Sequence, residues 1–259
     1  MIVVTGATGN VGRPLTQALA EAGAQVTTVS RHAAAAAADG VRHVPADLAQ
    51  PQSLTPALNG AKALAAASGV RRVVLLSSQG VATRPHGVSR IAMRAVEDAL
   101  RESGLDWTVL RPGGFASNAL AWAESVRTQQ TVAAPFGDVG VPIVDPADIA
   151  QVAAACLLDD RHTGTVLELT GPEVITPRQQ AQAIAAALGS PVRFHELTRE
   201  QAMAAMTQSV PPALADDTLD ITAAPNPAEL RISPDVERVL GRAPSPFNDW
   251  VARNITAFR

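Results

Sequence analysis

Short apolar runs alternate along the chain with longer segments in which apolar residues recur at helical spacing. Strands are expected at residues 2–5, 25–29, 41–44, 72–77, 107–111 and 166–169. Helices are expected at residues 11–22, 53–58 and 89–103, after Asp145, after Thr176, after Thr198 and at residues 246–258. Because strands separated by helices form parallel sheets, this alternation predicts an α/β fold with a Rossmann-type, doubly wound parallel sheet.

Local signals define helix ends and faces. Asp145 before Pro146 is a typical N-cap, and Thr176 and Thr198 each open a capping box. In the helix at 89–103 the side chains expected to face the core are Ile91, Ala92, Ala95, Val96, Ala99 and Leu100. Residues 209–227 have weak periodicity and many prolines, so we expect a loop or lid there. The alanine run at 33–38 is interpreted as a surface helix.

The alternation breaks between residues 59 and 71. A strand is due there, yet the segment has no β-branched run and joins one helix end to the last turns of another. Either the protein lacks this strand, or residues are missing from the sequence between Ala61 and Lys62. We favour the second interpretation.

A glycine-rich turn follows the first expected strand. Gly6, Gly9 and Gly12 are spaced three apart, and in a strand–turn–helix context such glycines permit the tight turn, the approach of a pyrophosphate, and close packing of the helix. Because the turn also precedes a second strand at the right distance, it predicts a nicotinamide dinucleotide site rather than a bare structural turn.

The end of the second expected strand indicates which dinucleotide is bound. NAD sites usually have an acidic residue there, whereas this chain has Ser30 and Arg31. A hydroxyl and a guanidinium suit a 2′-phosphate, so NADP(H) is favoured over NAD(H), unless Arg31 is simply a solvated surface residue. Asp47, after the third strand, is a candidate partner for the adenine amino group, with a turn cap as the alternative.

Composition excludes several other classes of protein. The chain has 259 residues, of which 47% are hydrophobic and 17% charged, so it has enough apolar residues for a large core. A net charge of −3 without a basic run argues against nucleic acid as a partner, and no segment has the length and apolarity of a membrane span. With one cysteine, Cys156, and an expected strand from Ile2 that leaves no room for a signal peptide, we expect a cytoplasmic protein.

Several segments resemble one family. They are Thr5-Gly6-Ala7-Thr8-Gly9-Asn10-Val11-Gly12, Ala46-Asp47-Leu48, Val74-Leu75-Leu76-Ser77-Ser78, Ser103-Gly104-Leu105-Asp106-Trp107-Thr108-Val109-Leu110-Arg111-Pro112-Gly113, Asp145-Pro146-Ala147-Asp148-Ile149-Ala150 and Leu169-Thr170-Gly171-Pro172-Glu173. Together they resemble the NmrA-like atypical short-chain dehydrogenases, in particular the bacterial NAD(P)H:quinone oxidoreductase type. The resemblance extends to about Gln201 and specifies the family better than the substrate.

This resemblance implies a Rossmann domain at residues 1–135, to which residues 140–165 return, and a smaller α/β lobe at 166–259 that binds substrate. It implies cofactor contacts by Gly6, Ala7, Thr8, Gly9, Asn10, Val11, Gly12, Ser30, Arg31, Asp47, Leu48, Ser77, Ser78, Pro112, Gly113 and Phe115. It places Asn118 towards the substrate, and we expect Gln79 there as well. Phe115 and Trp122 are aromatic side chains that could stack on an aromatic substrate, with core packing as an alternative that explains them at least as well.

The chain contains no tyrosine. Short-chain dehydrogenases generally use a Tyr-x-x-x-Lys pair to move the substrate proton, and this chain cannot. Three possibilities follow: an acceptor such as a quinone that needs no protein acid, a proton donated by His86 or Ser78, or a protein that binds the cofactor without turnover. His86 is a candidate because imidazoles titrate near neutral pH, with a plain surface-loop histidine as the alternative.

The first hypothesis is therefore an NADP(H)-dependent oxidoreductase acting on a quinone or related aromatic ketone. A tailoring enzyme of aromatic polyketide metabolism is one form that this hypothesis takes. The second is a non-catalytic NADP-binding redox sensor of the NmrA type. A nucleotide-sugar epimerase is a weaker third, because epimerases also use the tyrosine. No histidine spacing indicates a metal site, Cys156 is expected in the core, and we expect a monomer or a homodimer.

Overall fold

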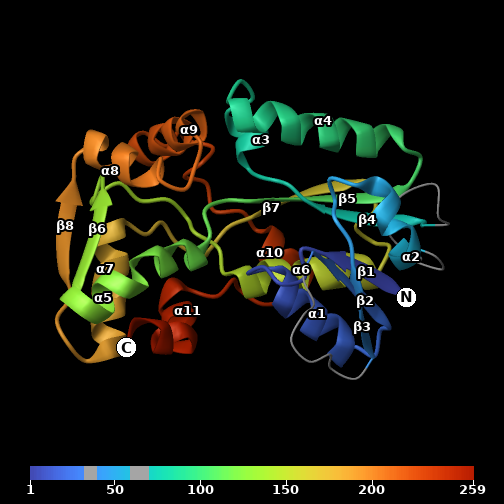
Figure 1. Ribbon diagram of the computed structural model, residues 1–259, viewed down its shortest axis with the longest axis horizontal. Coiled ribbons are helices and arrows are strands. Elements are labelled where there is room, and N and C mark those ends of the chain that lie inside the picture. Colours follow the sequence, from blue (N-terminus) through green and yellow to red (C-terminus); the bar gives the residue numbers. More distant parts are fainter. Residues whose placement is uncertain (32–39, 59–69) are drawn as a thin grey trace.

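The main sheet of the molecule consists of two parallel three-stranded parts. The computed structural model describes residues 1–31, 40–58 and 70–259. One part has the order β1 (Ile2–Thr5), β2 (Val26–Ser30), β3 (Val41–Pro45), and the other has the order β4 (Arg72–Leu76), β5 (Asp106–Pro112), β7 (Thr165–Leu169). All pairs within them are parallel, which confirms the predicted Rossmann-type architecture (Figure 1).

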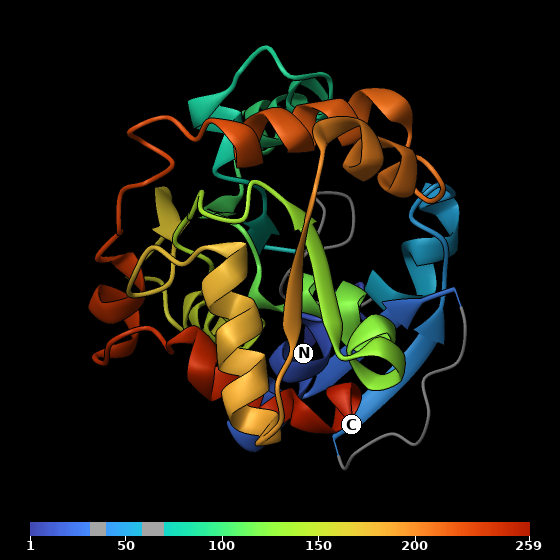
Figure 2. The same ribbon diagram turned by 90° about the vertical axis from the view of Figure 1, so that its left-hand side faces the viewer.

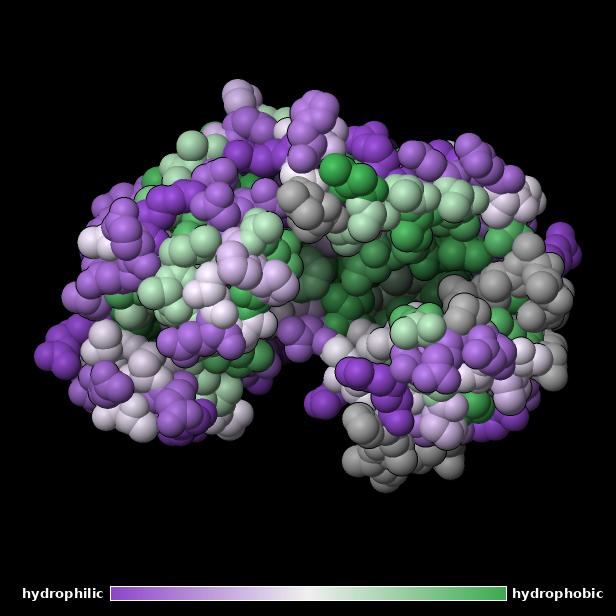
Figure 3. Space-filling view, turned by 45° about the horizontal axis from the view of Figure 1, so that its top comes forward, coloured by the Kyte–Doolittle hydropathy of each residue, from purple (hydrophilic) through white to green (hydrophobic). Residues whose placement is uncertain are grey.

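The two parts are not joined by hydrogen bonds between described strands. Within residues 1–31, 40–58 and 70–259, β1 pairs only with β2, and β4 pairs only with β5. A doubly wound sheet has a strand at this position, as the sequence pattern indicated. The expected junction at Ala61 and Lys62 lies outside the described residues, as does the alanine run at 33–38. Figure 3 shows a hollow with a largely hydrophobic surface between the part that carries α4 and the part that carries α1.

Helices cover both faces of this sheet. Helices α1 (Gly12–Glu21) and α6 (Pro146–Leu158) lie on one face, and α4 (Val88–Glu102) lies on the other (Figure 1). Two short segments, the 3₁₀ helix η1 (Pro51–Leu54) and α2 (Thr55–Leu58), follow β3. Asp145 caps α6 as predicted, because its side chain accepts a hydrogen bond from Ala147 N. Cys156 is 1% exposed in the core beneath α6, which confirms the expected role.

The prediction for the inner face of α4 is wrong except for Leu100, which packs against a core cluster. Ile91 is 59% and Val96 52% exposed, Ala92, Ala95 and Ala99 are also exposed, and Leu100 is half-buried. The side of α4 that faces the sheet instead carries the fully buried Glu97, whose charge is compensated by arginines. Apolar periodicity therefore located the helix correctly but assigned its orientation wrongly, since the buried side carries a charged residue held in an ion-pair cluster.

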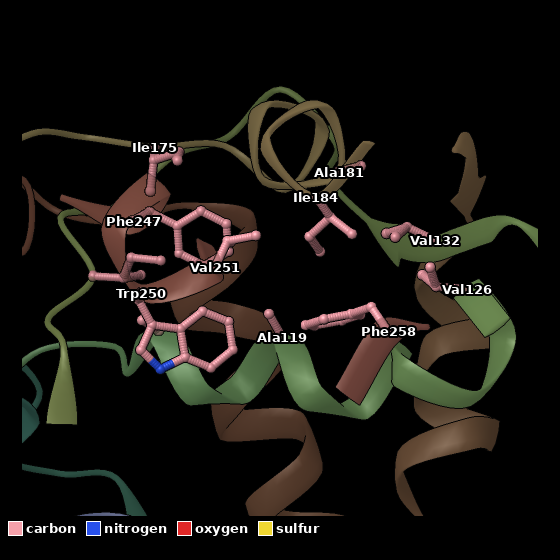
Figure 4. Close-up of a cluster of buried hydrophobic side chains, with 12 residues drawn as sticks. Ala119, Val126, Val132, Ile175, Ala181, Ile184, Phe247, Trp250, Val251 and Phe258 are labelled. Atoms are coloured by element: carbon pink, nitrogen blue, oxygen red, sulfur yellow. The ribbon is translucent and has the colours of Figure 1, made fainter. Parts of the chain in front are cut away.

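A second, smaller unit lies beside the main sheet. Its two parallel strands are β6 (Thr131–Pro135) and β8 (Arg193–Leu197), which lie side by side in Figure 2. Its helical segments are η3 (Ala116–Trp122), α5 (Ala123–Gln129), α7 (Pro177–Leu188), α8 (Arg199–Met206), α11 (Phe247–Asn254) and η4 (Ile255–Phe258). Figure 4 shows its core, where the Trp250 ring lies 5.5 Å from that of Phe247 and 6.4 Å from that of Phe258.

Two strands differ from the expected division of the chain. Strand β6 falls within the segment assigned to the Rossmann domain, yet it pairs with β8 of the smaller unit. Strand β7 falls at the start of the segment assigned to the small lobe, yet it pairs with β5 in the main sheet. We therefore propose that the chain crosses between the units more often than a single boundary near residue 166 allows.

Helix signals in the second half of the chain have mixed outcomes. Thr176 and Thr198 form the predicted capping boxes of α7 and α8. The loop expected at 209–227 is wrong for most of its length, because α9 (Pro212–Ala223) forms there with Ala215 and Leu219 buried. A proline in the first turn starts a helix rather than breaking it. Helix α10 (Asp235–Leu240) follows, and no helix among the described residues is long and apolar enough to cross a membrane.

Candidate functional site

The glycine-rich turn (residues 6–12) connects the carboxyl end of β1 to the N-terminus of α1. Gly6 has φ +64°, and its carbonyl accepts a hydrogen bond from Gly9 N at 2.9 Å. A Cβ on Gly12 would lie 2.1 Å from the Gly6 carbonyl oxygen and 2.7 Å from the Ala7 Cα, so no larger residue fits. Helix α1 therefore begins directly against the turn, and its N-terminal N–H groups face the carboxyl edge of the sheet, where a pyrophosphate binds in this fold.

The N-terminus of α1 carries no negative charge of its own. Its first turn has no acidic residue, and Val11 at the N-cap provides no side-chain hydrogen bond within the described structure. The neighbouring Asn10 donates a hydrogen bond from Nδ2 to Ser117 Oγ at 3.1 Å, which joins this turn to η3 across the carboxyl edge. The positive end of the helix dipole is therefore available to an anion.

The residues expected around the adenosine lie at the same edge of the sheet. Ser30 ends β2, and Arg31 follows it as an exposed side chain that forms no ion pair with any described residue. Asp47 follows β3, and its carboxylate accepts a hydrogen bond from Ala49 N at 3.0 Å, which is the turn-capping role given as the alternative. Leu48 is 60% exposed beside it.

Ser77 lies directly after β4 and belongs to a buried charge cluster that the sequence did not indicate. Its hydroxyl donates to Glu97 Oε1 at 2.5 Å. Arg111 of β5 holds the same carboxylate through Nε at 3.0 Å and Nη2 at 2.6 Å, and Arg101 adds a hydrogen bond at 2.8 Å. Burial opposes ionisation of Glu97, yet the hydrogen bonds from Arg111, Ser77 and Arg101 outweigh it and lower its pKa to about 2.

The two residues proposed as proton donors, Ser78 and His86, are less buried than Ser77. Ser78 is half-buried, and its Oγ accepts a hydrogen bond from Gly80 N at 3.2 Å at the start of α3 (Gly80–Thr83). His86 is exposed in the loop between α3 and α4. It lines a cavity of about 210 Å³ together with Arg84, Gly87, Arg90, Asp217, Asp220 and Ile221. A catalytic role for Ser78 or His86 stays a prediction.

The residues expected on the nicotinamide and substrate side follow β5. Pro112 is buried, and Gly113 N donates to Leu169 O at 3.0 Å, next to Gln79. Phe115 packs against the core cluster beneath α6, and Trp122 packs against the core of the smaller unit, as the core-packing alternative described. Asn118 is exposed in η3.

The structure thus places most of the expected site residues at one edge. The glycine-rich turn, Ser30, Arg31 and Asp47 follow β1, β2 and β3, while Ser77, Ser78, Gln79 and Pro112–Phe115 follow β4 and β5. The carboxyl edge of a parallel sheet is where ligands bind in doubly wound folds. His86 and Trp122 lie further along the chain, beyond the segments that directly follow the strands. Within the described residues, no group of three or more His, Cys, Asp or Glu side chains could hold a metal ion.

Comparisons with known proteins agree with this geometry. The profile of an NAD(P)H-binding family matches residues 6–69 and 63–160. The chain is 36% identical to the (4-alkanoyl-5-oxo-2,5-dihydrofuran-3-yl)methyl phosphate reductase of Streptomyces griseus, over 100% of this chain and 99% of the relative. That alignment spans 280 positions, so the relative has residues without a counterpart among the 259 here.

Two further similar proteins also align with this chain over nearly their whole length. The NAD(P)H azoreductase of Xenophilus azovorans is 31% identical over 100% of this chain and 99% of its own. The crystal structure of an NADPH-dependent quinone oxidoreductase from Escherichia coli superposes with a TM-score of 0.79 at 27% identity, covering 99% of this chain and 98% of that one. This chain therefore belongs to the NAD(P)H-binding family, among oxidoreductases of the same fold.

Proposed function

We propose that this protein is an NADP(H)-dependent oxidoreductase that reduces a quinone or a related aromatic ketone. The observation that carries the proposal is the glycine-rich turn, where Gly12 brings α1 so close to Gly6 that a Cβ would lie 2.1 Å from its carbonyl oxygen. Such a turn at the carboxyl end of β1 suits a dinucleotide pyrophosphate. The relatives named as reductases and quinone oxidoreductases support the class of reaction.

We assign the described residues to the parts of NADP(H) as follows. The backbone of Gly6, Ala7, Thr8, Gly9, Asn10, Val11 and Gly12 would hold the pyrophosphate. Arg31, exposed and without an ion-pair partner in the described chain, would bind the 2′-phosphate, with Ser30 beside it. Asp47 and Leu48 would flank the adenine, and Ser77, Ser78, Pro112, Gly113 and Phe115 would line the nicotinamide half.

The Glu97 cluster narrows the candidates for a proton donor. The Ser77 hydroxyl already donates to Glu97 at 2.5 Å, so its proton is not directed towards a substrate. NADPH, when bound, supplies the hydride for the reduction. A quinone suits this site because the reduced product takes up its protons from water and needs no protein acid. Gln79, Phe115, Asn118 and Trp122 remain the proposed substrate contacts.

We further propose that the protein works in the cytoplasm as a monomer or homodimer, with a small molecule rather than nucleic acid or membrane as its partner. The single cysteine and the net charge of −3 support this. A role in tailoring aromatic polyketides is compatible with the reductase relatives.

The test is steady-state oxidation of NADPH with a panel of acceptors. The panel contains benzoquinone, naphthoquinones, an azo dye and an acyl-dihydrofuranone phosphate, the last two chosen after the names of the relatives. We expect at least one quinone to be reduced well above background. Measurable binding of NADPH without oxidation by any acceptor would refute the proposal. It would favour the regulator hypothesis, which recovery of a stable protein partner would then support.

A further inference from the structure

A strap of residues 224–233 joins α9 to α10 and crosses the carboxyl ends of the second sheet part (Figure 1). Gln79, which follows β4, donates from Nε2 to Ala228 O at 3.2 Å. At the other end of the strap, Ser233 N donates to Oγ1 of Thr170, which follows β7, at 3.0 Å. The strap therefore runs along the edge where a substrate binds in this fold.

One partly buried ion pair fastens the strap to Arg84, which directly follows α3. Arg84 donates to Glu229 through Nε at 2.8 Å and through Nη2 at 2.9 Å, and its Nη2 also reaches Ala224 O at 2.7 Å. Thr83 Oγ1 and Asn226 N add hydrogen bonds to the same carboxylate, each at 2.9 Å. The Glu229 side chain is 5% exposed and the Arg84 side chain 27%, so the carboxylate is shielded from water while the guanidinium is partly accessible.

The ion pair fixes a position more than it contributes stability. A buried ion pair is often no more stabilising than apolar side chains of similar volume, because both charges lose their hydration. The strap has no helix or strand of its own, and its Leu230 and Ile232 are 39% and 47% exposed. Side-chain hydrogen bonds therefore do much to determine where this segment lies.

The same arginine borders the cavity between the α3–α4 loop and α9. This cavity measures about 210 Å³ and is lined on one side by Arg84, His86 and Arg90 and on the other by Asp217 and Asp220. Pockets for drug-sized ligands usually measure about 300–1,000 Å³. The space beside Arg84 therefore suits only a small ligand or a part of a larger one.

We propose that Arg84 and Glu229 are positioning residues that set the size of the acceptor, because their ion pair holds the strap over the carboxyl ends of β4 and β7. This inference rests on the proposed reductase function and names the residues that determine which acceptors the enzyme reduces. Glu229 touches neither cofactor nor substrate under this proposal. Glu229 acts through Gln79, whose side-chain amide is hydrogen-bonded to the strap, and through Arg84, which forms part of the cavity wall.

The experiment compares Glu229→Gln with the wild type by two independent measurements. Hydrogen exchange of the backbone amides of residues 224–233 reports on how firmly the strap is held. The values of kcat/KM for a small benzoquinone and for a bulky polycyclic quinone, each measured with NADPH, report on selection by acceptor size. We expect exchange to become at least tenfold faster and the bulky-to-small ratio to rise at least fivefold, with NADPH affinity within twofold. Arg84→Lys, which keeps the charge but loses the fork geometry, should give intermediate values.

A matched control lies in the same strap. Arg231 pairs with Glu168 at the exposed surface, so Arg231→Gln should change neither the exchange rate nor the acceptor ratio. Unchanged strap exchange in folded Glu229→Gln, or an equal loss of activity with both quinones, would overturn the proposal. If the wild type reduces no acceptor, the proposed reductase function fails, whereas the exchange measurement still decides whether this ion pair holds the strap.

Discussion

Replacing Gly12 by alanine perturbs the contact on which the cofactor site depends. The new Cβ would lie 2.1 Å from the Gly6 oxygen, 2.7 Å from the Ala7 Cα and 2.8 Å from the Gly6 carbonyl carbon, whereas ordinary contact begins at 3.4 Å. All three atoms are backbone, so the turn and α1 must separate by about 1 Å. Overpacking of this kind costs about 1–3 kcal/mol of folding free energy.

The loss of cofactor affinity should exceed what this loss of stability implies. One misaligned hydrogen bond to a charged phosphate costs about 1.5–3 kcal/mol, which weakens NADPH binding roughly tenfold or more. Titration of NADPH fluorescence measures the affinity, and thermal unfolding shows that the variant is folded.

The control for this variant is Gly164→Ala. Gly164 has φ +73° with open space around it and lies in the turn before β7, so its substitution strains the backbone without touching the site. We expect a cost of about 1 kcal/mol in stability and unchanged NADPH affinity. Full NADPH affinity in folded Gly12→Ala would refute the reasoning that places the pyrophosphate on this turn.

Three further variants or measurements test other parts of the account. Arg31→Glu should raise the KM for NADPH at least tenfold relative to that for NADH, since about 1.5–3 kcal/mol is at stake in a charged hydrogen bond, and an equal effect on both cofactors would contradict the 2′-phosphate contact. Glu97→Gln should lower the free energy of unfolding by about 3–5 kcal/mol at neutral pH, measured in denaturant, because it leaves the largely buried Arg111 without its counterion, whereas Arg101 keeps Asp98. Because the pKa of Glu97 falls to about 2 on folding, its ionisation contributes about 3 kcal/mol of stability above pH 4.5, and this contribution is lost as the pH falls towards 2. If plots of unfolding free energy against pH for the wild type and Glu97→Gln run parallel between pH 4.5 and 2, this prediction is wrong. Burial raises the pKa of the Cys156 thiol to about 12, so iodoacetamide should label it only after unfolding, and labelling of the native protein would show that the site is not closed.

The sequence allowed the Rossmann architecture and the cofactor turn to be predicted because both depend on local signals. A strand of four apolar or β-branched residues, three glycines and an amphipathic helix follow one another between Ile2 and Glu21. Capping at Asp145, Thr176 and Thr198 was equally local, since each side chain bonds to a backbone N–H two or three residues ahead.

The features that were missed depend on contacts between distant residues. The Glu97 cluster joins Ser77, Arg101 and Arg111, and no spacing along the chain relates β4 to β5 in this way. Glu97 lies on the buried face of α4, whereas Ile91 and Val96 of the apolar stripe are exposed, so the stripe was misleading. Strand β8 was missed because its residues are largely exposed, with a burial pattern that lacks the regular alternation of a core strand.

The strap shows the same limit. Residues 224–233 have no periodic pattern, and their place depends on Glu229 meeting Arg84, which directly follows α3 and is far away in the sequence. The loop or lid expected at 209–227 overlaps this segment only at residues 224–227, and most of the expected loop forms α9. A polar loop with one buried carboxylate gives no local signal of its own.

The most direct test of the account is a rapid-mixing experiment on the protein with one equivalent of bound NADPH. The absorbance of the reduced nicotinamide is followed after addition of a quinone, with free NADPH and Gly12→Ala as references. The account predicts a single exponential loss of the bound NADPH signal, much faster than in either reference. Bound NADPH that persists as long as free NADPH with every quinone of the panel would contradict the claim that this site transfers hydride to a quinone.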